Sequence, residues 1–295
     1  MSEVVVQDII GQKMEKIKTI FQKAQEQASK AEDINELIAF LQTTEKEFLP
    51  VAYEGAAMTL ALNDFSEGDS ISNWKQLLDS SKKYSCQIYL GMGWAVGQQK
   101  KSELPFLELL SRNMQFRMWD GCGYYDGIFR QRQSIKSKKR SENILPKDFQ
   151  AYDEGLGRSL WYICKGDVAK VGEMLATFDL ERHVDLWRGV SIACCFVGGF
   201  DENKLKELIV SSGEYKVQLG IGAAMVAKIR IEADCITDNV ELANKVFNQL
   251  SAEEAMKITV KNKSVPNFSF STFILQMESD LMKVVDSRQK EKVDN

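Results

Sequence analysis

W-D-G-C-G-Y-Y-D-G-I-F-R, from Trp119 to Arg130, holds glycines, aromatics and carboxylates at a higher density than any other stretch of the 295-residue chain. Its first glycine, Gly121, has an aromatic residue two positions before it and a small residue two positions after it. The pattern returns around other glycines, and the six marks are Gly55, Gly91, Gly121, Gly155, Gly189 and Gly220. They are separated by 36, 30, 34, 34 and 31 residues. Periods of this length are typical of helical repeat proteins.

Each glycine mark leads into a segment that is apolar nearly all round, such as A-A-M-T-L-A-L or R-S-L-W-Y-I. The residue two positions after the mark is small in all six cases: Ala57, Gly93, Gly123, Gly157, Ser191 and Gly222. A helix of this composition is buried on most sides, and its small residues let neighbouring backbones approach closely. The sequence therefore predicts one buried helix at each mark.

Amphipathic stretches separate the buried segments, namely Asn73–Leu78, Leu104–Met114, Val168–Phe178, Leu205–Ser211 and Val240–Leu250. Asp167, Asp201 and Asp238 stand near expected helix starts, where a side-chain oxygen caps the first turn. The pattern predicts an all-α fold in which about six helical hairpins stack as an α-solenoid or a curled array. An irregular all-α bundle is the alternative, and the run V-S-I-A-C-C-F-V at 190–197 also suits a strand.

Helical caps are expected at both ends of the array, which gives three regions: 1–47, 48–250 and 251–295. Residues 3–30 read as one long helix, because apolar residues recur three and four apart, at Ile10, Met14, Ile17, Phe21, Ala24 and Ala28. This seam packs on the body or pairs with a second copy in a dimer. A short helix begins after Asp33, and S-A-E-E-A-M-K-I begins the last helix of the array. A loop at Lys261–Asn267 and a helix at Phe270–Val285 follow.

Composition argues against several classes of protein. A net charge of −4 argues against nucleic-acid binding, which usually requires a basic excess. The N-terminus has an acidic residue in place of the basic region of a secretory signal, so we expect no such signal. The longest apolar runs are about half of the roughly 20 residues of a membrane span, and we expect a cytoplasmic protein. The six cysteines form no C-x-x-C and read as buried free thiols. With His183 as the single histidine, we predict no metal site and no cofactor.

A basic run interrupts the pattern at 130–140, where six cations stand within eleven residues: Arg130, Arg132, Lys136, Lys138, Lys139 and Arg140. A solvated loop is the simplest interpretation. The functional interpretation is a mobile basic lid, or a docking surface for an acidic partner such as an acyl carrier protein or a phosphate-bearing substrate.

Candidate site residues follow from stacking the buried helices. Residues just before the marks, Glu54, Asp120, Glu154 and Arg188, are then expected to form a polar ladder. Desolvation raises the pKa of carboxylates on an apolar surface, which makes them candidates for general-acid work. We take Asp120, Glu154 and Asp126 as catalytic candidates. The substrate-binding candidates are Tyr53, Tyr89, Trp94, Trp119, Tyr124, Tyr125, Arg158, Trp187 and Arg188.

The structural alternative is that Asp120 or Glu154 pairs with Arg158 or Arg188 in a buried ion pair that holds the helices in register. The two aspartate-rich runs that mark isoprenoid cyclases are missing. G-M-G-W-A-V-G and G-C-G-Y-Y-D-G lack the Lys-Ser/Thr ending of a phosphate-binding P-loop.

Five motifs in order give this chain a family resemblance: F-L-P-V-A-Y-E-G-A-A-M-T-L-A-L, G-M-G-W-A-V-G, W-D-G-C-G-Y-Y-D-G-I-F, D-E-G-L-G-R-S-L-W-Y and D-L-W-R-G-V-S. Over residues 48–250 the chain resembles an uncharacterised bacterial family found beside enediyne polyketide gene clusters. The resemblance implies a role in making or handling an apolar, polyunsaturated natural product. It assigns no catalytic residue.

Two hypotheses follow. The first is a biosynthetic protein that encloses an apolar polyene, polyketide or isoprenoid chain and acts as a cyclase or isomerase by acid catalysis. The second is a non-catalytic scaffold or carrier-protein-binding module that uses a concave face. A closed cavity lined by the aromatics favours the first, and an open groove beside a fully ion-paired ladder favours the second.

Overall fold

The structure, a computed structural model, describes residues 3–68, 70–99, 104–142, 144–261 and 269–293. Helices make up 81% of it, and this described part contains no β-strand. The prediction of an all-α fold is confirmed. The alternative of a strand at 190–197 is wrong, because that run lies inside helix α9 (Leu180–Val197) and is buried on nearly all sides there.

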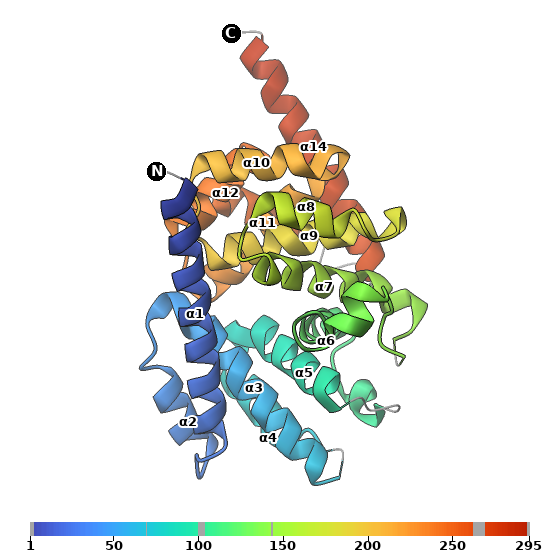
Figure 1. Ribbon diagram of the computed structural model, residues 1–295. Coiled ribbons are helices and arrows are strands. Elements are labelled where there is room, and N and C mark those ends of the chain that lie inside the picture. Colours follow the sequence, from blue (N-terminus) through green and yellow to red (C-terminus); the bar gives the residue numbers. More distant parts are fainter. Residues whose placement is uncertain (1–2, 69, 100–103, 143, 262–268, 294–295) are drawn as a thin grey trace.

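Eight helices pack side by side in the order in which they occur along the chain (Figure 1). They are α1 (Glu3–Ala28), α3 (Leu49–Ser66), α5 (Ser85–Gln99), α6 (Gln115–Phe129), α7 (Phe149–Ile163), α9, α11 (Lys216–Glu232) and α13 (Ala252–Lys261). Six of these eight helices, α3, α5, α6, α7, α9 and α11, contain one glycine mark each.

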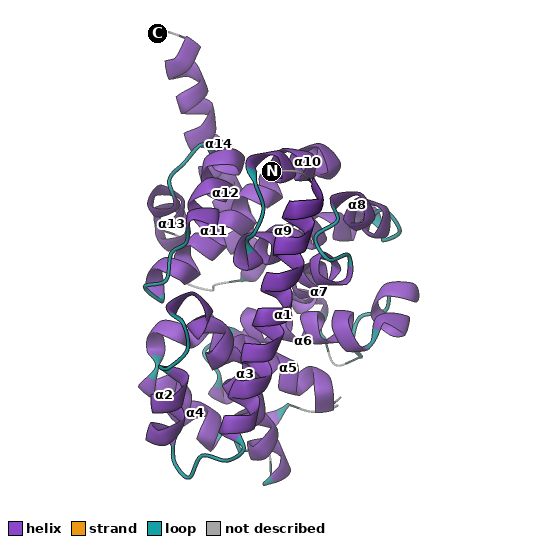
Figure 2. Ribbon diagram, turned by 60° about the vertical axis from the view of Figure 1, so that its left-hand side comes forward, coloured by secondary structure: helices purple, strands orange, loops and turns teal. Residues whose placement is uncertain are grey.

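Shorter helices connect these long ones: α2 (Ile34–Leu41), α4 (Ser72–Ser80), α8 (Val168–Leu175), α10 (Glu202–Ser212) and α12 (Asp238–Asn248). Of these, α8 packs on α10 and α10 on α12. The last helix, α14 (Phe270–Val293), lies against α11 and α13 over its first half and then projects from the body (Figure 2).

The glycine marks are contact points between successive helices. A Cβ atom on Gly155 of α7 would lie 1.8 Å from the carbonyl oxygen of Asp120 on α6. A Cβ on Gly189 of α9 would lie 1.9 Å from the carbonyl oxygen of Glu154 on α7. The contacted carbonyl in each case belongs to the residue just before the preceding mark. Only glycine permits this approach, so the glycine spacing reports the packing of the helices.

The long helix α1 packs on the body of the protein, which is one of the two arrangements expected for its apolar seam. Its apolar seam is buried at Ile10, Met14 and Ile17, while Gly55 of α3 lies against the backbone of Phe21. In Figure 1, α1 runs along the side of the stack from α3 to α9 and α10. Helix α1 therefore contacts both an early helix of the stack, α3, and a later one, α9.

Helix starts follow the expected capping chemistry in three places. The side chains of Asp33, Asp167 and Asp201 accept hydrogen bonds from backbone N–H groups in the first turns of α2, α8 and α10. Asp238 also stands at a helix start, as expected, but it is the first residue of α12, and Thr237 takes the N-cap position. An acidic residue inside the first turn still favours the helix dipole.

Two connecting segments differ from prediction. The prediction of an α-helix at Leu104–Met114 is wrong, because only a 3₁₀-helix forms there, at Pro105–Leu109. This short helix ends at Leu110, which has an extended backbone conformation. The loop expected at 130–140 contains a π-helix, Arg132–Lys136. The loop predicted for Lys261–Asn267 falls outside the described residues, apart from the last residue of α13.

Candidate functional site

Helical geometry decides which candidate residues meet. An α-helix turns about 100° per residue, so the residue before a mark and the residue three after it are four apart and share one face. Asp120 and Tyr124 are related in this way on α6, and Glu154 and Arg158 on α7. A residue two positions before a mark is turned by about 100° from that face. The predicted aromatics that stand two before a mark therefore point elsewhere than those that stand three after it.

Asp120 is buried between two arginines. Arg158 of α7 donates from Nη1 to Asp120 Oδ1 over 2.9 Å. Arg117, one turn earlier on α6, places its Nη1 3.5 Å from Asp120 and 3.3 Å from Glu154. The carboxylates of Asp120 and Glu154 are therefore joined by one shared cation, Arg117.

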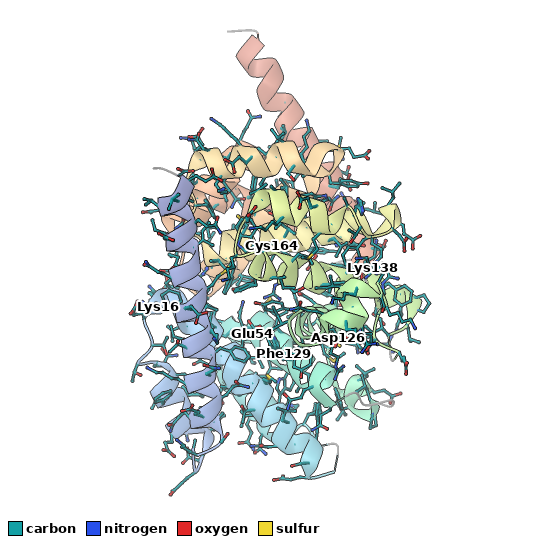
Figure 3. The ribbon with its side chains drawn as sticks, in the orientation of Figure 1. Lys16, Glu54, Asp126, Phe129, Lys138 and Cys164 are labelled. Carbon is teal, nitrogen blue, oxygen red and sulfur yellow. The ribbon has the colours of Figure 1, made fainter. Side chains whose placement is uncertain are left out.

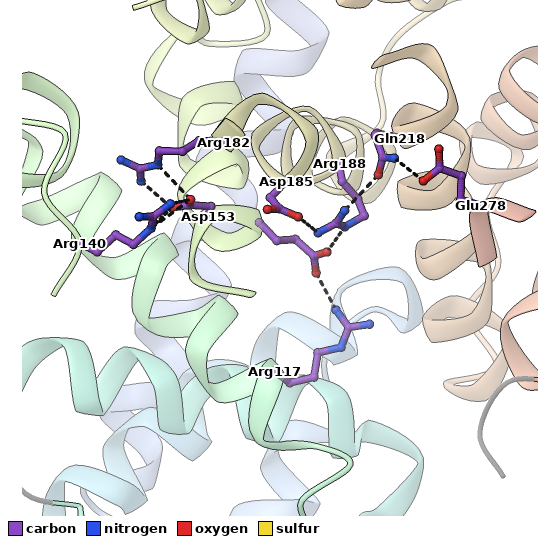
Figure 4. Close-up of polar contacts among 9 residues, drawn as sticks. Arg117, Arg140, Asp153, Arg182, Asp185, Arg188, Gln218 and Glu278 are labelled. Carbon is purple, nitrogen blue, oxygen red and sulfur yellow. Dashed lines mark hydrogen bonds and ion pairs between the residues drawn. The ribbon is translucent and has the colours of Figure 1, made fainter. Parts of the chain in front are cut away.

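Glu154 continues the network toward the C-terminal helices (Figure 4). Arg188 of α9 donates from Nε to Glu154, from Nη2 to Asp185, and from Nη1 to Gln218 of α11 over 3.0 Å. Burial raises the pKa values of the Glu154 and Asp185 carboxyl groups, and Arg188 opposes both shifts. The pairing anticipated by the structural alternative is therefore the observed geometry for Asp120 and Glu154.

Asp126 lies in a different environment. It accepts a hydrogen bond from Tyr152 Oη over 2.8 Å, and Arg130 Nη1 lies 3.1 Å away. Both of these partners lie outside the ladder. The structure therefore separates Asp126 from the other two catalytic candidates.

Glu54 is the ladder residue that the catalytic candidates left out. Glu54 is 5% exposed, and its Oε1 accepts a hydrogen bond from Trp94 Nε1 over 2.8 Å. Within the described ranges no Lys, Arg or His side chain forms an ion pair with Glu54. Burial raises the pKa of Glu54 to about 7, although the charge of nearby Arg158 lowers it. The sequence signal for this residue was its place just before the first mark.

Aromatic rings surround Trp94, the hydrogen-bond donor to Glu54. The centroid of its ring lies 5.0 Å from Phe21, 4.8 Å from Tyr124, 5.9 Å from Tyr125 and 6.0 Å from Phe129. We call these five residues the aromatic cluster. Three predicted substrate-binding residues, Trp94, Tyr124 and Tyr125, thus belong to it. The Arg158 guanidinium, a fourth, lies over the Tyr124 ring at 4.5 Å.

The aromatics two positions before the marks pack elsewhere in the core. Tyr53 stacks on Tyr84 with centroids 4.0 Å apart and accepts a hydrogen bond from Gln42. Tyr89 meets the edge of Trp74. Two more, Trp119 and Trp187, are buried as well. The structure does not gather these four residues around Glu54.

The basic run at 130–140 is partly anchored. Asp153 of α7 forms ion pairs with both Arg140 and Arg182 (Figure 4), and Lys138 donates to the Ile135 carbonyl and to Thr177. These bonds argue against a freely mobile lid. The exposed cations of the run are Arg132, Lys136 and Lys139.

A surface hollow of about 470 Å³ lies in this segment. We call it the basic hollow, and it is lined by Arg130, Arg132, Gln133, Ser137, Lys139 and Glu142. A second hollow of about 300 Å³ is lined mainly by apolar residues of α11, α12 and α14, among them Val217, Phe247 and Leu281. Neither hollow is lined by the ladder or by the aromatics of the cluster.

Comparison with known families places these features in context. The family described as "Protein of unknown function (DUF1702)" matches residues 5–272. The chain belongs to this family. The match takes in α1 and the start of α14, so the shared region is longer than the 48–250 covered by the sequence motifs. A search of curated proteins found no match, and neither did a search of solved structures.

This DUF1702 chain offers no metal-binding cluster in its described residues, where no group of three or more His, Cys, Asp or Glu side chains converges. All six cysteines are free and buried, as predicted. No helix in the described part combines the length and apolar character needed to cross a membrane.

Proposed function

We propose that this protein is a cytoplasmic biosynthetic protein that binds an apolar polyene, polyketide or isoprenoid chain, and that Glu54 donates a proton in its cyclisation or isomerisation. The observation that carries the proposal is the environment of one carboxyl group. Glu54 is buried and hydrogen-bonded to the indole of Trp94, which packs on Tyr124, whereas the ladder carboxylates Asp120 and Glu154 are ion-paired. The resemblance to the family beside enediyne gene clusters supports the substrate class.

The chemistry follows from the pKa of Glu54, which burial raises to about 7. A general acid works best when its pKa lies near the working pH, because it is then both protonated and able to release its proton. Glu54 Oε1 is engaged by Trp94, which assigns the proton to Oε2. The proton passes to a double bond or carbonyl of the chain. The resulting carboxylate then removes a proton from a neighbouring carbon, so the net reaction is an isomerisation or a cyclisation.

Positive charge that develops on the chain is stabilised by the rings of the aromatic cluster. An aromatic face attracts a cation within about 6 Å, and indole does so most strongly. Trp94 and Tyr124 stand edge to face, with their centroids 4.8 Å apart. Trp94 turns the N–H at its ring edge toward Glu54, and the Arg158 guanidinium already lies over Tyr124. In this proposal a carbocation or an oxocarbenium ion therefore forms over the face of the Trp94 indole.

The test is turnover of candidate polyene substrates by Glu54→Gln. This variant keeps the size and the hydrogen bond from Trp94 but cannot donate a proton, so we expect turnover to be lost while the far-UV circular dichroism is unchanged. The earlier catalytic candidates are compared through Asp120→Asn and Glu154→Gln, which remove an ion-pair partner and are expected to lower stability. Full turnover by Glu54→Gln would refute the assignment of Glu54.

A second function, a non-catalytic scaffold or carrier-protein-binding module, is favoured by the ion-paired part of the ladder. Asp120, Glu154 and Arg188 are bonded as structural residues would be. In this proposal about six helical hairpins form a solenoid, and the basic hollow docks an acidic partner such as an acyl carrier protein. Native mass spectrometry of the purified protein separates the two, because a co-purifying apolar ligand supports the first function only.

A further inference from the structure

The basic hollow has an excess of positive charge at its surface. Three cations line it, Arg130, Arg132 and Lys139, against one carboxylate, Glu142. Arg130 is already paired with Asp126. The side chains of Arg132 and Lys139 are exposed, and their charge is available to an anion from solvent. A guanidinium and an ammonium at one hollow fit a phosphate group, because arginine binds phosphate through paired N–H donors and lysine as a point charge.

The hollow adjoins the aromatic cluster through Arg130. The Arg130 guanidinium lies over the Tyr125 ring at 5.4 Å, while Tyr125 and Phe129 have ring centroids 4.8 Å apart. Phe129 in turn contacts Trp94, whose Nε1 donates to Glu54. In the view of Figure 3, Glu54, Phe129 and Asp126 follow one another across the middle of the molecule. A row of rings thus joins the charged hollow to the buried carboxyl group.

Phe129 is the exposed end of this row. Its side chain is 62% exposed at the C-terminal end of α6, although it packs against Trp94 and Tyr125. Phe129 is joined to the hollow through Tyr125 and Arg130, so the exposed aromatic and the exposed cations belong to one connected, amphipathic region. The matching ligand has an anionic end for the cations and an apolar part that covers the ring and removes it from water.

We propose that the basic hollow binds the phosphate of an apolar chain, and that the chain covers the exposed ring of Phe129, which is the surface end of the row of rings leading to Glu54. The inference rests on the proposed function, whose apolar ligand it specifies as a phosphate ester or diphosphate ester. Two sources share this chemistry: a free phosphate ester, and the phosphopantetheine group that a carrier protein attaches to a growing chain. In both, phosphate recognition fixes one end of the molecule and places its chain against the rings.

The test compares the binding of geranyl phosphate, geraniol and inorganic phosphate to the full chain by isothermal titration calorimetry. We expect geranyl phosphate to bind at least about tenfold more tightly than either of the other two, because it engages both the hollow and the rings. Arg132→Ala/Lys139→Ala should abolish the advantage of geranyl phosphate over geraniol and weaken the binding of inorganic phosphate, without affecting the binding of geraniol. Lys136→Ala is the matched control, because Lys136 is exposed in the same run but does not line the hollow.

The apolar half of the site is tested by Phe129→Ala, with Val210→Ala as the control. Val210 is an 81% exposed apolar side chain on α10. Phe129→Ala should weaken the binding of geranyl phosphate and of geraniol by about tenfold each, and it should leave the binding of inorganic phosphate unchanged. Equal effects of the two variants would overturn the inference, as would equal binding of geranyl phosphate and geraniol to the wild-type protein.

The source of the phosphate is assigned by a third probe, the octanoyl thioester of phosphopantetheine. Binding tighter than that of geranyl phosphate supports a carrier-borne chain, and weaker binding supports a free ester. Failure of this inference differs from failure of the proposed function. If geraniol binds and Glu54-dependent turnover persists but phosphate adds nothing, the inference alone is wrong. If no apolar probe binds the wild-type protein, the proposed function is wrong as well.

Discussion

Replacing Arg188 by methionine tests the central part of the buried network. Arg188 has no exposed surface and bonds Glu154, Asp185 and Gln218. Methionine fills most of the volume but leaves Asp185 without its arginine and Glu154 with only the more distant Arg117. Removing one partner of a buried ion pair typically costs roughly 3–5 kcal/mol. Against a typical free energy of unfolding of about 5–15 kcal/mol, the loss is large enough to measure by urea denaturation.

The loss should depend on pH in a definite direction. Burial already raises the pKa values of Glu154 and Asp185, and removal of Arg188 raises both further. The folded variant then holds more protons than the unfolded chain, so its stability falls as the pH rises. The deficit should be smallest below about pH 3, where the carboxyl groups are mostly protonated in both the folded and the unfolded state.

The control for this measurement is Lys206→Met. Lys206 pairs with Glu202 on the surface of α10, where both side chains are more than half exposed. Such a pair contributes about 0–1 kcal/mol. The double variant Arg188→Met/Glu154→Gln should recover part of the loss, because it removes one of the stranded charges. A deficit in Arg188→Met no larger than that of Lys206→Met, or one that shrinks as the pH rises, would contradict the network.

Two further predictions concern the glycine marks and Glu54. Gly155→Ala should destabilise the fold severely, because its Cβ would meet the Asp120 carbonyl oxygen at 1.8 Å. Gly11→Ala on α1, where a Cβ meets nothing within 4 Å, should be neutral or stabilise by up to about 1 kcal/mol in the same thermal denaturation assay. The pKa of Glu54 is about 4.5 in the unfolded chain and about 7 in the folded protein. As the pH rises through this range, the free energy of unfolding of the wild-type protein should fall by about 3 kcal/mol relative to that of Glu54→Gln. Parallel stability curves for the two proteins between those pH values would show that Glu54 has an ordinary pKa.

The fold was predictable at positions where a single physical requirement permits only one type of residue. A glycine that lies against a neighbouring carbonyl tolerates no side chain, so Gly91, Gly121, Gly155 and Gly189 report helix contacts directly in the sequence. The all-helical class and the long N-terminal helix follow from composition and periodicity. The segment after α5 was less predictable, because apolar residues spaced as in a helix also suit the 3₁₀ turn that forms after Pro105.

The candidate site was predictable only in part, because spacing within one helix does not show what the neighbouring helix supplies. The ladder positions were found, but Arg117 and Asp185 were not, although each lies three residues before a ladder residue and so shares its face. The aromatics two positions before the marks were expected beside the ladder, yet that offset turns them by about 100° from it. Trp94 lies four residues after Leu90, and Tyr124 lies four residues after Asp120. Each therefore shares a helix face with the residue just before a mark.

A difference of residue type at one offset explains why Glu54, unlike Asp120, has no arginine from the next long helix as its hydrogen-bond partner. On α7, Arg158 stands three residues after a mark and bonds Asp120 on the preceding helix. On α5, the same offset holds Trp94, which bonds Glu54 on the preceding helix. An indole satisfies one oxygen but supplies no charge, so burial keeps the pKa of Glu54 high. Trp94→Arg should therefore lower that pKa toward its usual value and abolish turnover at neutral pH. It should also remove the stability difference that Glu54→Gln makes between about pH 4.5 and 7 in the wild-type background. If that difference persisted in the Trp94→Arg background, the absence of a cation at this offset would not be what sets the pKa of Glu54.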